Sequence, residues 1–269
     1  MLLSAPTSSH IEVTTLPQLS PVGPWQIELS HDRAQDLIVW ITRGQGQVLL
    51  DGKRYGFGAH NLFYIPAGSL WSLNLGRQCF GSCVFIPRPD QKTQDRQAVF
   101  LRVNGGQEQA FITFLLDRLQ REQREQQEGW SEAMSSLASV LQIELRRAAD
   151  AAGTPSRISA AQRLSRAYCN RVARHYCEGA TMSDHAEALD VTPTHLTRVC
   201  KAETGKTAAS LLTERQLHSA RSLLTYSDTP IQEIASKLGF RSPAYFTRFI
   251  SQHTGLTPSR LRKTARELA

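Results

Sequence analysis

The sequence predicts an α+β protein, in which an N-terminal β-barrel with a helical hairpin precedes an all-helical domain containing two helix–turn–helix repeats. The chain has 269 residues, a length that suggests two domains. Residues 1–156 hold 13 of the 17 glycines and all four tryptophans, a composition typical of turn-rich β structure. Residues 157–269 hold 17 Lys and Arg against 9 Asp and Glu, whereas the first half holds 14 against 15. Basic charge confined to the second half indicates a domain that binds a polyanion.

The strands of the first domain, which we place at residues 1–150, are predicted between residues 37 and 86. Short runs rich in β-branched and aromatic residues, such as "LIVWI" and "LFYIP", alternate with turn signals. One of these signals is the hairpin dipeptide Asp51-Gly52. Many short and closely spaced strands are typical of a small antiparallel barrel or sandwich.

A helical hairpin is predicted at residues 107–149, where the apolar period lengthens to that of a helix and Gly129 interrupts it. The apolar residues of the two helical faces are Ala110, Phe111, Phe114, Leu115 and Leu119, and then Met134, Leu137, Leu141, Leu145 and Ala148. These stripes need a partner, which is either the barrel or a second subunit. We favour a second subunit and therefore predict a homodimer. The segment "AADAAGTPS" at 148–156 is the expected linker between the domains.

The second domain, predicted at residues 157–269, contains an internal repeat. Residues 192–207, "TPTHLTRVCKAETGKT", align with residues 242–257, "SPAYFTRFISQHTGLT", at an offset of 50. The identical pairs are Pro193 and Pro243, Thr197 and Thr247, Arg198 and Arg248, Thr204 and Thr254, Gly205 and Gly255, and Thr207 and Thr257. Each copy predicts a helix, a tight turn and a second helix, with the two units at about 182–203 and 231–253.

The second helix of each repeat carries a polar face beside one arginine. The residues of this face are Thr194, His195, Thr197, Arg198 and Lys201 in the first repeat, and Ala244, Tyr245, Thr247, Arg248 and Ser251 in the second. Such a face suits a helix in the major groove of double-stranded DNA, where Arg pairs with guanine and Thr contacts a thymine methyl. Arg241, in the preceding turn, is expected to contact a phosphate. A merely solvated face is the alternative for one helix, but two equivalent faces in the basic segment favour DNA.

Residues 168–262 resemble the DNA-binding domain of the AraC/XylS transcriptional regulators. The resemblance rests on the segment "IQEIASKLGFRSPAYFTRFISQHTGLTPSRLR" at 231–262 and on a linker-helix pattern. The residues of that pattern are Arg215, Leu217, Ala220, Leu223 and Leu224. The resemblance implies two helix–turn–helix units joined by a long helix. The chain departs from the family pattern at His185, Asp190, Cys200 and Leu261, where the family usually has Leu, Gly, Phe and Tyr.

The segment "ITRGQGQVLLDGKRYGFGAHNLFYIPAGSLW" is similar to the cupin-like effector domain found upstream in many family members. Cupin enzymes hold a metal through a His-x-His cluster, a Glu and a further His, but Trp71 occupies the place of that further His. The predicted barrel has no His-x-His, so we expect no metal, no other cofactor and no enzymatic activity. Arg43 stands where an arginine reaches the ligand in sugar-responsive members. We expect it to line an effector pocket with Trp40, Tyr64 and Trp71, and the alternative is that the tryptophans fill the core.

Three functions compete on these grounds. We favour a sequence-specific regulator that responds to a small-molecule effector, such as a sugar or an aromatic acid, and activates catabolic or transport genes, with RNA polymerase as a candidate partner. The second is a cupin-type metalloenzyme with an appended DNA-binding domain. The third is a DNA-repair methyl acceptor, which the scattered cysteines do not favour. The start "MLLSAPTSSH" has no secretion signal and no run approaches about 18 apolar residues, so we expect a cytoplasmic protein without a membrane partner.

Overall fold

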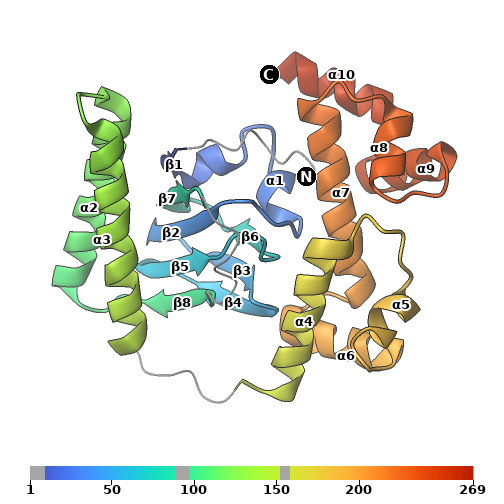
Figure 1. The fold of residues 1–269 in the computed structure, drawn as a ribbon, viewed down its shortest axis with the longest axis horizontal. Coiled ribbons are helices and arrows are strands. Elements are labelled where there is room, and N and C mark those ends of the chain that lie inside the picture. The colour runs from blue at the N-terminus through green and yellow to red at the C-terminus, as the bar shows by residue number, and fades with distance from the viewer. Residues whose placement is uncertain (1–9, 89–96, 152–157, 269) are drawn as a thin grey trace.

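The computed structural model describes residues 10–88, 97–151 and 158–268 and has the predicted α+β class. Two β-sheets occupy the N-terminal half, and the C-terminal half is helical (Figure 1). Helices α2 and α3 cover one side of the strands, and the C-terminal helices lie on the other side (Figure 1). The order of a β domain, a helical hairpin and a helical domain is therefore as the sequence predicts.

The N-terminal strands form two antiparallel sheets. The larger sheet has the strand order β1-β7-β2-β5-β8 and the smaller one the order β4-β3-β6. The strands are β1 (Glu12–Thr15), β2 (Asp36–Arg43), β3 (Gly46–Leu50), β4 (Lys53–Phe57), β5 (Asn61–Ile65), β6 (Ser72–Leu75), β7 (Phe80–Ile86) and β8 (Val99–Arg102). In the described part of the chain no strand is paired to strands of both sheets, so the strands form two facing sheets and not a closed barrel.

The predicted hairpin at Asp51-Gly52 is confirmed. Leu50 pairs with Lys53 across the turn, and the two central residues have φ values of 52° and 70°. Positive φ at both central positions is the property of a type I′ turn, whose twist matches that of the flanking strands.

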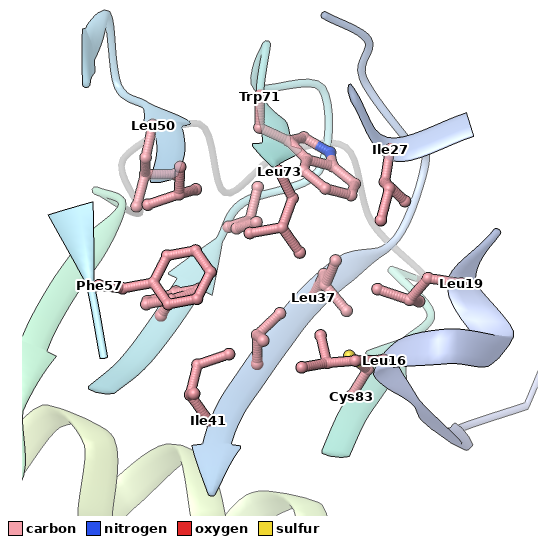
Figure 2. Close-up of a cluster of buried hydrophobic side chains, with 14 of the residues drawn as sticks. Leu16, Leu19, Ile27, Leu37, Ile41, Leu50, Phe57, Trp71, Leu73 and Cys83 are labelled. Atoms are coloured by element: carbon pink, nitrogen blue, oxygen red, sulfur yellow. The ribbon is translucent and has the colours of Figure 1, made fainter. Parts of the chain in front are cut away.

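Apolar side chains from both sheets meet in a core between them, and Figure 2 shows them pointing toward one another. Trp71 and Phe57 are the largest of these labelled side chains, and both are buried. Leu16 and Leu19, from the short helix Leu16–Leu19, close one side of this core together with Ile27 of α1 (Trp25–Glu28). The packing of these rings and branched chains holds the smaller sheet against the larger one.

The helical hairpin consists of α2 (Gly106–Glu125) and α3 (Trp130–Ala151), and it packs on the outer face of the larger sheet. Its buried residues share a core with Trp40 and Tyr64 of that sheet. The stripe residues in this core are Leu115, Leu119, Met134, Leu141 and Leu145. The prediction that these five residues form a dimer surface is therefore wrong, because the protein's own sheet covers them. Phe111 and Phe114, from the same predicted stripe, are exposed.

The C-terminal half contains two helical units on either end of a long helix. The first unit is α4 (Ala160–His175), α5 (Met182–Glu187) and α6 (Pro193–Thr204), and α7 (Ala208–Tyr226) is the connecting helix. The second unit is α8 (Ile231–Lys237) and α9 (Pro243–Thr254), followed by α10 (Pro258–Leu268). Each unit has its own apolar core, and α7 contributes Leu211 to the first and Leu224 to the second.

The two units also touch each other directly through backbone. Gly239, in the turn between α8 and α9, has a φ of 75°, and Gly179, in the loop after α4, has a φ of 69°. A Cβ at Gly239 would lie 2.2 Å from the carbonyl oxygen of Cys177. Only glycine at both positions permits this conformation and this close approach.

Candidate DNA interface and effector pocket

The sequence determines locally where α6 begins and ends. Thr192 accepts a hydrogen bond from the backbone N–H of His195 at 3.2 Å, and Pro193 occupies the first turn. The helix ends at Gly205, which has a φ of 77°. These two signals set the bounds of the helix, and the spacing of its apolar residues sets which side chains face outward.

The polar face of α6 points to solvent, as the sequence predicts. Thr194, His195, Arg198 and Lys201 are exposed and Thr197 is half-buried, whereas Leu196, Val199 and Cys200 face the core. An Nη2 of Arg198 donates to Nδ1 of His195 over 3.2 Å. This bond orients the guanidinium along the helix face and leaves its other N–H groups free to bind acceptors.

Helix α9 repeats this construction in the second unit. Ser242 accepts a hydrogen bond from the N–H of Tyr245 at 3.2 Å, Pro243 follows, and the helix ends at Gly255 with a φ of 72°. Phe246 and Ile250 are buried. Ala244, Tyr245 and Arg248 are exposed, Thr247 is half-buried, and Arg241 is exposed in the turn before the helix.

One aromatic residue that supports α9 was not identified from the sequence. Phe240 lies 5.9 Å from Tyr245, 5.1 Å from Phe246 and 5.0 Å from Phe249, measured between ring centroids. It therefore braces the start of the helix and limits the positions that the Tyr245 ring can adopt. The sequence feature that could have identified Phe240 is its position directly after the turn glycine Gly239.

The first unit accommodates its departures from the family pattern with specific contacts. Nδ1 of the buried His185 accepts a hydrogen bond from Nε of Arg171 at 3.1 Å, and burial with this cation lowers the pKa of the imidazole. Asp190 adopts a φ of 54°, a conformation that aspartate tolerates better than most residues. Burial raises the pKa of the Cys200 thiol to about 12, so this side chain behaves as a small apolar residue.

The four predicted effector residues do not line one cavity. Trp71 lies between the two sheets, whereas Trp40 and Tyr64 lie on the opposite face of the larger sheet, under α2 and α3. Arg43 is exposed at the end of β2, where it donates to the side chain of Gln78 over 3.4 Å. Trp40 and Trp71 are both buried in apolar cores, so the alternative prediction, that the tryptophans fill the core, agrees with the structure.

Tyr64 does border a cavity between the larger sheet and α3. The cavity has a volume of about 480 Å³ and mixes apolar with polar walls. Its other lining residues include Val99, Gln142, Leu145 and Arg146. Tyr64 donates its hydroxyl to Asp36 at 2.8 Å, which fixes the ring at the cavity wall.

The described residues offer neither a cluster of metal ligands nor a helix that could span a membrane. Nowhere in residues 10–88, 97–151 and 158–268 do three His, Cys, Asp or Glu side chains come close enough together to hold a metal ion. Among the described helices, none has both the length and the apolar character needed to cross a bilayer.

Comparisons with known proteins agree with this geometry. A family model described as a helix-turn-helix domain matches residues 185–264. The raffinose operon transcriptional regulatory protein of Pediococcus pentosaceus is 27% identical over 90 residues, which are 34% of this chain and 32% of that protein. The transcriptional activator RhaR of Salmonella schwarzengrund is 24% identical over 249 residues, 87% of this chain and 86% of that protein. The chain spans about a third of the length of the raffinose and lactose operon regulators that it matches.

Solved structures are also similar to parts of the chain. The C-terminal domain of AraT from Geobacillus stearothermophilus is 31% identical, with a TM-score of 0.36, over 40% of this chain and 88% of that one. ToxT of Vibrio cholerae, solved with a bound unsaturated fatty acid, is 11% identical with a TM-score of 0.45, over 97% of both chains.

Proposed function

We propose that this chain is a transcriptional regulator of the AraC/XylS family, which binds double-stranded DNA sequence-specifically and activates transcription in response to a small molecule. The helix-turn-helix family model over residues 185–264 and the similarity to RhaR along 87% of the chain support this proposal. The observation that carries the proposal is the pair of equivalent helices, α6 and α9, each capped by Ser or Thr before Pro and each exposing an arginine at the same step. Two such faces on one rigid helical domain form a bipartite surface for the major groove.

The length of α7 suits two successive grooves. Its 19 residues span about 28 Å at ~1.5 Å per residue, close to the ~34 Å of one DNA turn once the flanking loops are added. In the bound complex Arg198 and Arg248 would reach guanine edges, and Thr197 and Thr247 would approach thymine methyls. Arg241 would bind a phosphate at the edge of the second groove.

A footprint tests this arrangement. Duplexes selected by the full chain from a random pool would be cleaved with hydroxyl radicals in its presence. We expect protection at two sites about one turn apart on one face of the duplex. Protection confined to one groove would contradict simultaneous docking of α6 and α9.

We assign the effector to the cavity bordered by Tyr64 and Arg146. Its volume is in the range of small-molecule sites, and its walls combine apolar surface with Arg146, which would bind the carboxylate of an aromatic or sugar acid, and with Asp150, which would accept hydrogen bonds from the hydroxyls of a sugar. A thermal-shift panel of such acids on the full chain would identify ligands, and Arg146→Gln should abolish their effect. Arg147→Gln is the matched control, because Arg147 pairs with Glu144 and does not line the cavity. Equal losses in both variants would contradict this site.

A second copy of the chain would bind the outer surface of the helical hairpin. Phe111, Phe114, Val140 and Ile143 are the exposed apolar residues of α2 and α3. Pairing through this surface would place four recognition helices on paired DNA sites and raise the affinity for them. Phe114→Asp should then convert a dimer to a monomer in sedimentation, whereas Thr113→Asp, on another face of α2, should not. A wild-type monomer at micromolar concentration would exclude this interface.

The relatives' names suggest the class of target genes. Regulators of a raffinose and a lactose operon are among them, and we propose catabolic or transport genes as targets here, with RNA polymerase as the partner in activation. We expect the protein to act in the cytoplasm, where its DNA target would be. Burial raises the pKa of the thiols of Cys79, Cys83, Cys169 and Cys200, which disfavours the thiolate that a methyl acceptor needs.

A further inference from the structure

The N-terminal half docks on the connecting helix α7 through one short segment. We call this contact, between residues 25–33 and α7, the seam. Its polar bonds are Ser30 N–H to Glu214 at 3.0 Å, Asp32 to Arg215 at 2.5 Å, the Gln26 carbonyl to Nε2 of His218 at 3.1 Å, and the Gln26 amide to the Tyr226 hydroxyl at 2.8 Å. Because α7 also joins the two helix–turn–helix units, the seam couples the N-terminal half to both of them.

Two histidines stack at the centre of the seam. The rings of His31 and His218 are 4.1 Å apart at their centroids and 7° from parallel. Trp71 packs on His31 at 4.2 Å, and Trp25 lies 5.5 Å from His218. His31 is buried and His218 is half-buried. The seam thus holds two imidazoles in face-to-face contact between two indole rings.

The hydrogen bonds of the pair favour a neutral His31 in the closed seam. Nδ1 of His31 donates to the carbonyl of Leu29 at 2.8 Å, while its Nε2 is buried without a hydrogen-bond partner among the described residues. A proton on that Nε2 would be a buried donor with nothing to bind, which is costly. His218 donates from Nε2 to the backbone carbonyl of Gln26, a bond that either protonation state can make, so the charges around the pair decide its protonation.

The charges around the pair also oppose protonation. The charged groups of the seam are Asp32 and Arg33 on the N-terminal segment, and Glu214, Arg215 and Arg221 on α7, with Lys206 just before that helix. The carboxylates already pair with Arg215 and Lys206. Burial, the partner imidazole and Arg33 lower the pKa of His31, and burial with Arg215 and Arg33 lowers that of His218.

We propose that the seam is a proton-operated latch, closed while His31 and His218 are both neutral and opened when either imidazole is protonated. Opening exposes the rings to water, where an imidazole has a pKa near 6.5. The open form therefore binds protons that the closed form excludes, so the fraction of molecules with a closed seam falls as the pH falls through that value. A second set of contacts between the halves contains no histidine and would serve as the hinge. It comprises the ion pair of Arg166 with Asp51 at 2.6 Å, the hydrogen bond from the Ser165 hydroxyl to the Gly52 carbonyl at 2.6 Å, and Leu49 and Leu70 in the apolar core of the first unit.

The size of the effect follows from the number of protons. Compared with a group that stays neutral, a histidine with a pKa of about 6.5 in the open form raises the ratio of open to closed seam by a factor of about 11 at pH 5.5 and about 1.1 at pH 7.5. Two independent histidines multiply these factors. The equilibrium between open and closed seam should therefore shift about 100-fold between these pH values.

Amide hydrogen exchange of the full chain measures this equilibrium at a single reporter. The N–H of Ser30 donates across the seam to Glu214, so its protection factor, corrected for the intrinsic pH dependence of exchange, reports closure. The amides of the β2–β7 ladder report whether the N-terminal half stays folded. We expect Ser30 to lose about 100-fold of its protection from pH 7.5 to 5.5 while the ladder keeps its own.

Variants decide whether the histidines cause this loss. His31→Asn and His218→Gln keep an N–H donor at the nitrogen that binds backbone, and neither residue can be protonated in this range. The double variant should abolish the pH dependence, and His218→Gln alone should reduce it to about 10-fold. His253→Gln, on an exposed turn of α9, should leave it unchanged. Three results would overturn the proposal. They are a protection factor of Ser30 that does not depend on pH in the wild type, an equal loss of protection in the β2–β7 ladder, and a loss of about 100-fold at Ser30 in the His218→Gln variant.

Discussion

Replacing Leu141 by alanine tests whether the helical hairpin belongs to the core of its own half. Leu141 is fully buried between α3 and the larger sheet, and its neighbour Val140 is 36% exposed on the same helix. The substitution removes three carbons that cannot be replaced by solvent. At about 0.8 kcal/mol for each, with a further 1–2 kcal/mol for the cavity, the free energy of unfolding should fall by about 3–5 kcal/mol.

The matched control is Ser139→Ala, an exposed residue of the same helix that is not among those of the proposed dimer surface, and it should change the free energy of unfolding by less than about 0.5 kcal/mol. Urea unfolding followed by tryptophan fluorescence is the assay, because all four tryptophans lie in the N-terminal half, where Trp40 is buried under the hairpin and Trp25 also contacts α7. The slope of the transition should be the same in both variants, which shows that only stability has changed.

A small loss for Leu141→Ala would refute this reasoning. If the variant unfolded within about 1 kcal/mol of the wild type and sedimented as a monomer while the wild type was a dimer, Leu141 would lie at a subunit interface. That result would contradict the conclusion that the hairpin packs on the larger sheet of its own chain.

Three further outcomes can be checked. Arg248→Ala should cost about 1–3 kcal/mol of binding and relax preference at one base pair, whereas Arg241→Ala should weaken all sequences alike and flatten the salt slope by about one; equal losses of specificity would remove the distinction. Arg215→Ala should lower the free energy of unfolding by roughly 3 kcal/mol in urea titrations followed by circular dichroism, because it leaves a carboxylate of the seam unpaired. Cys200 should resist a thiol reagent at pH 8 while the half-buried Cys177 reacts, and equal labelling rates in the folded protein would contradict its burial.

Local signals in the sequence predicted the recognition helices, because their information is carried by neighbouring residues. Thr192-Pro193 and Ser242-Pro243 mark where α6 and α9 begin, and the spacing of apolar residues shows which face is buried. These features depend on backbone geometry and on a helical period, and both are readable without knowledge of the rest of the chain.

The effector residues could not be placed in this way, because β2 is buried on both faces. Val39 enters the core between the sheets, whereas its neighbour Trp40 enters the core under the hairpin. A continuous apolar run such as "LIVWI" carries no alternation that would separate the two sides. The sequence therefore could not indicate that Trp40 and Trp71 belong to different cores.

The seam was also beyond local reasoning. Asp32 and Arg215 are 183 positions apart, and no motif in the sequence links them. The linker-helix pattern did include Arg215, but as a residue of the DNA-binding domain. Its ion pair with Asp32 depends on how the two halves dock. The sequence pattern of each half indicates only the structure of that half.

The contact between Gly179 and Gly239 holds the two helical units, and with them α6 and α9, at one spacing and one relative rotation. Because backbone meets backbone there, the second unit cannot pivot about the end of α7 without leaving this contact. One extra base pair between the two reading sites would advance the second site by ~3.4 Å and rotate it by about 35°. If α6 and α9 dock together as proposed, a protein held by this contact could keep only one of the two helices in its groove after such an insertion. The proposed docking would therefore make the spacing between the two reading sites a determinant of specificity alongside the bases.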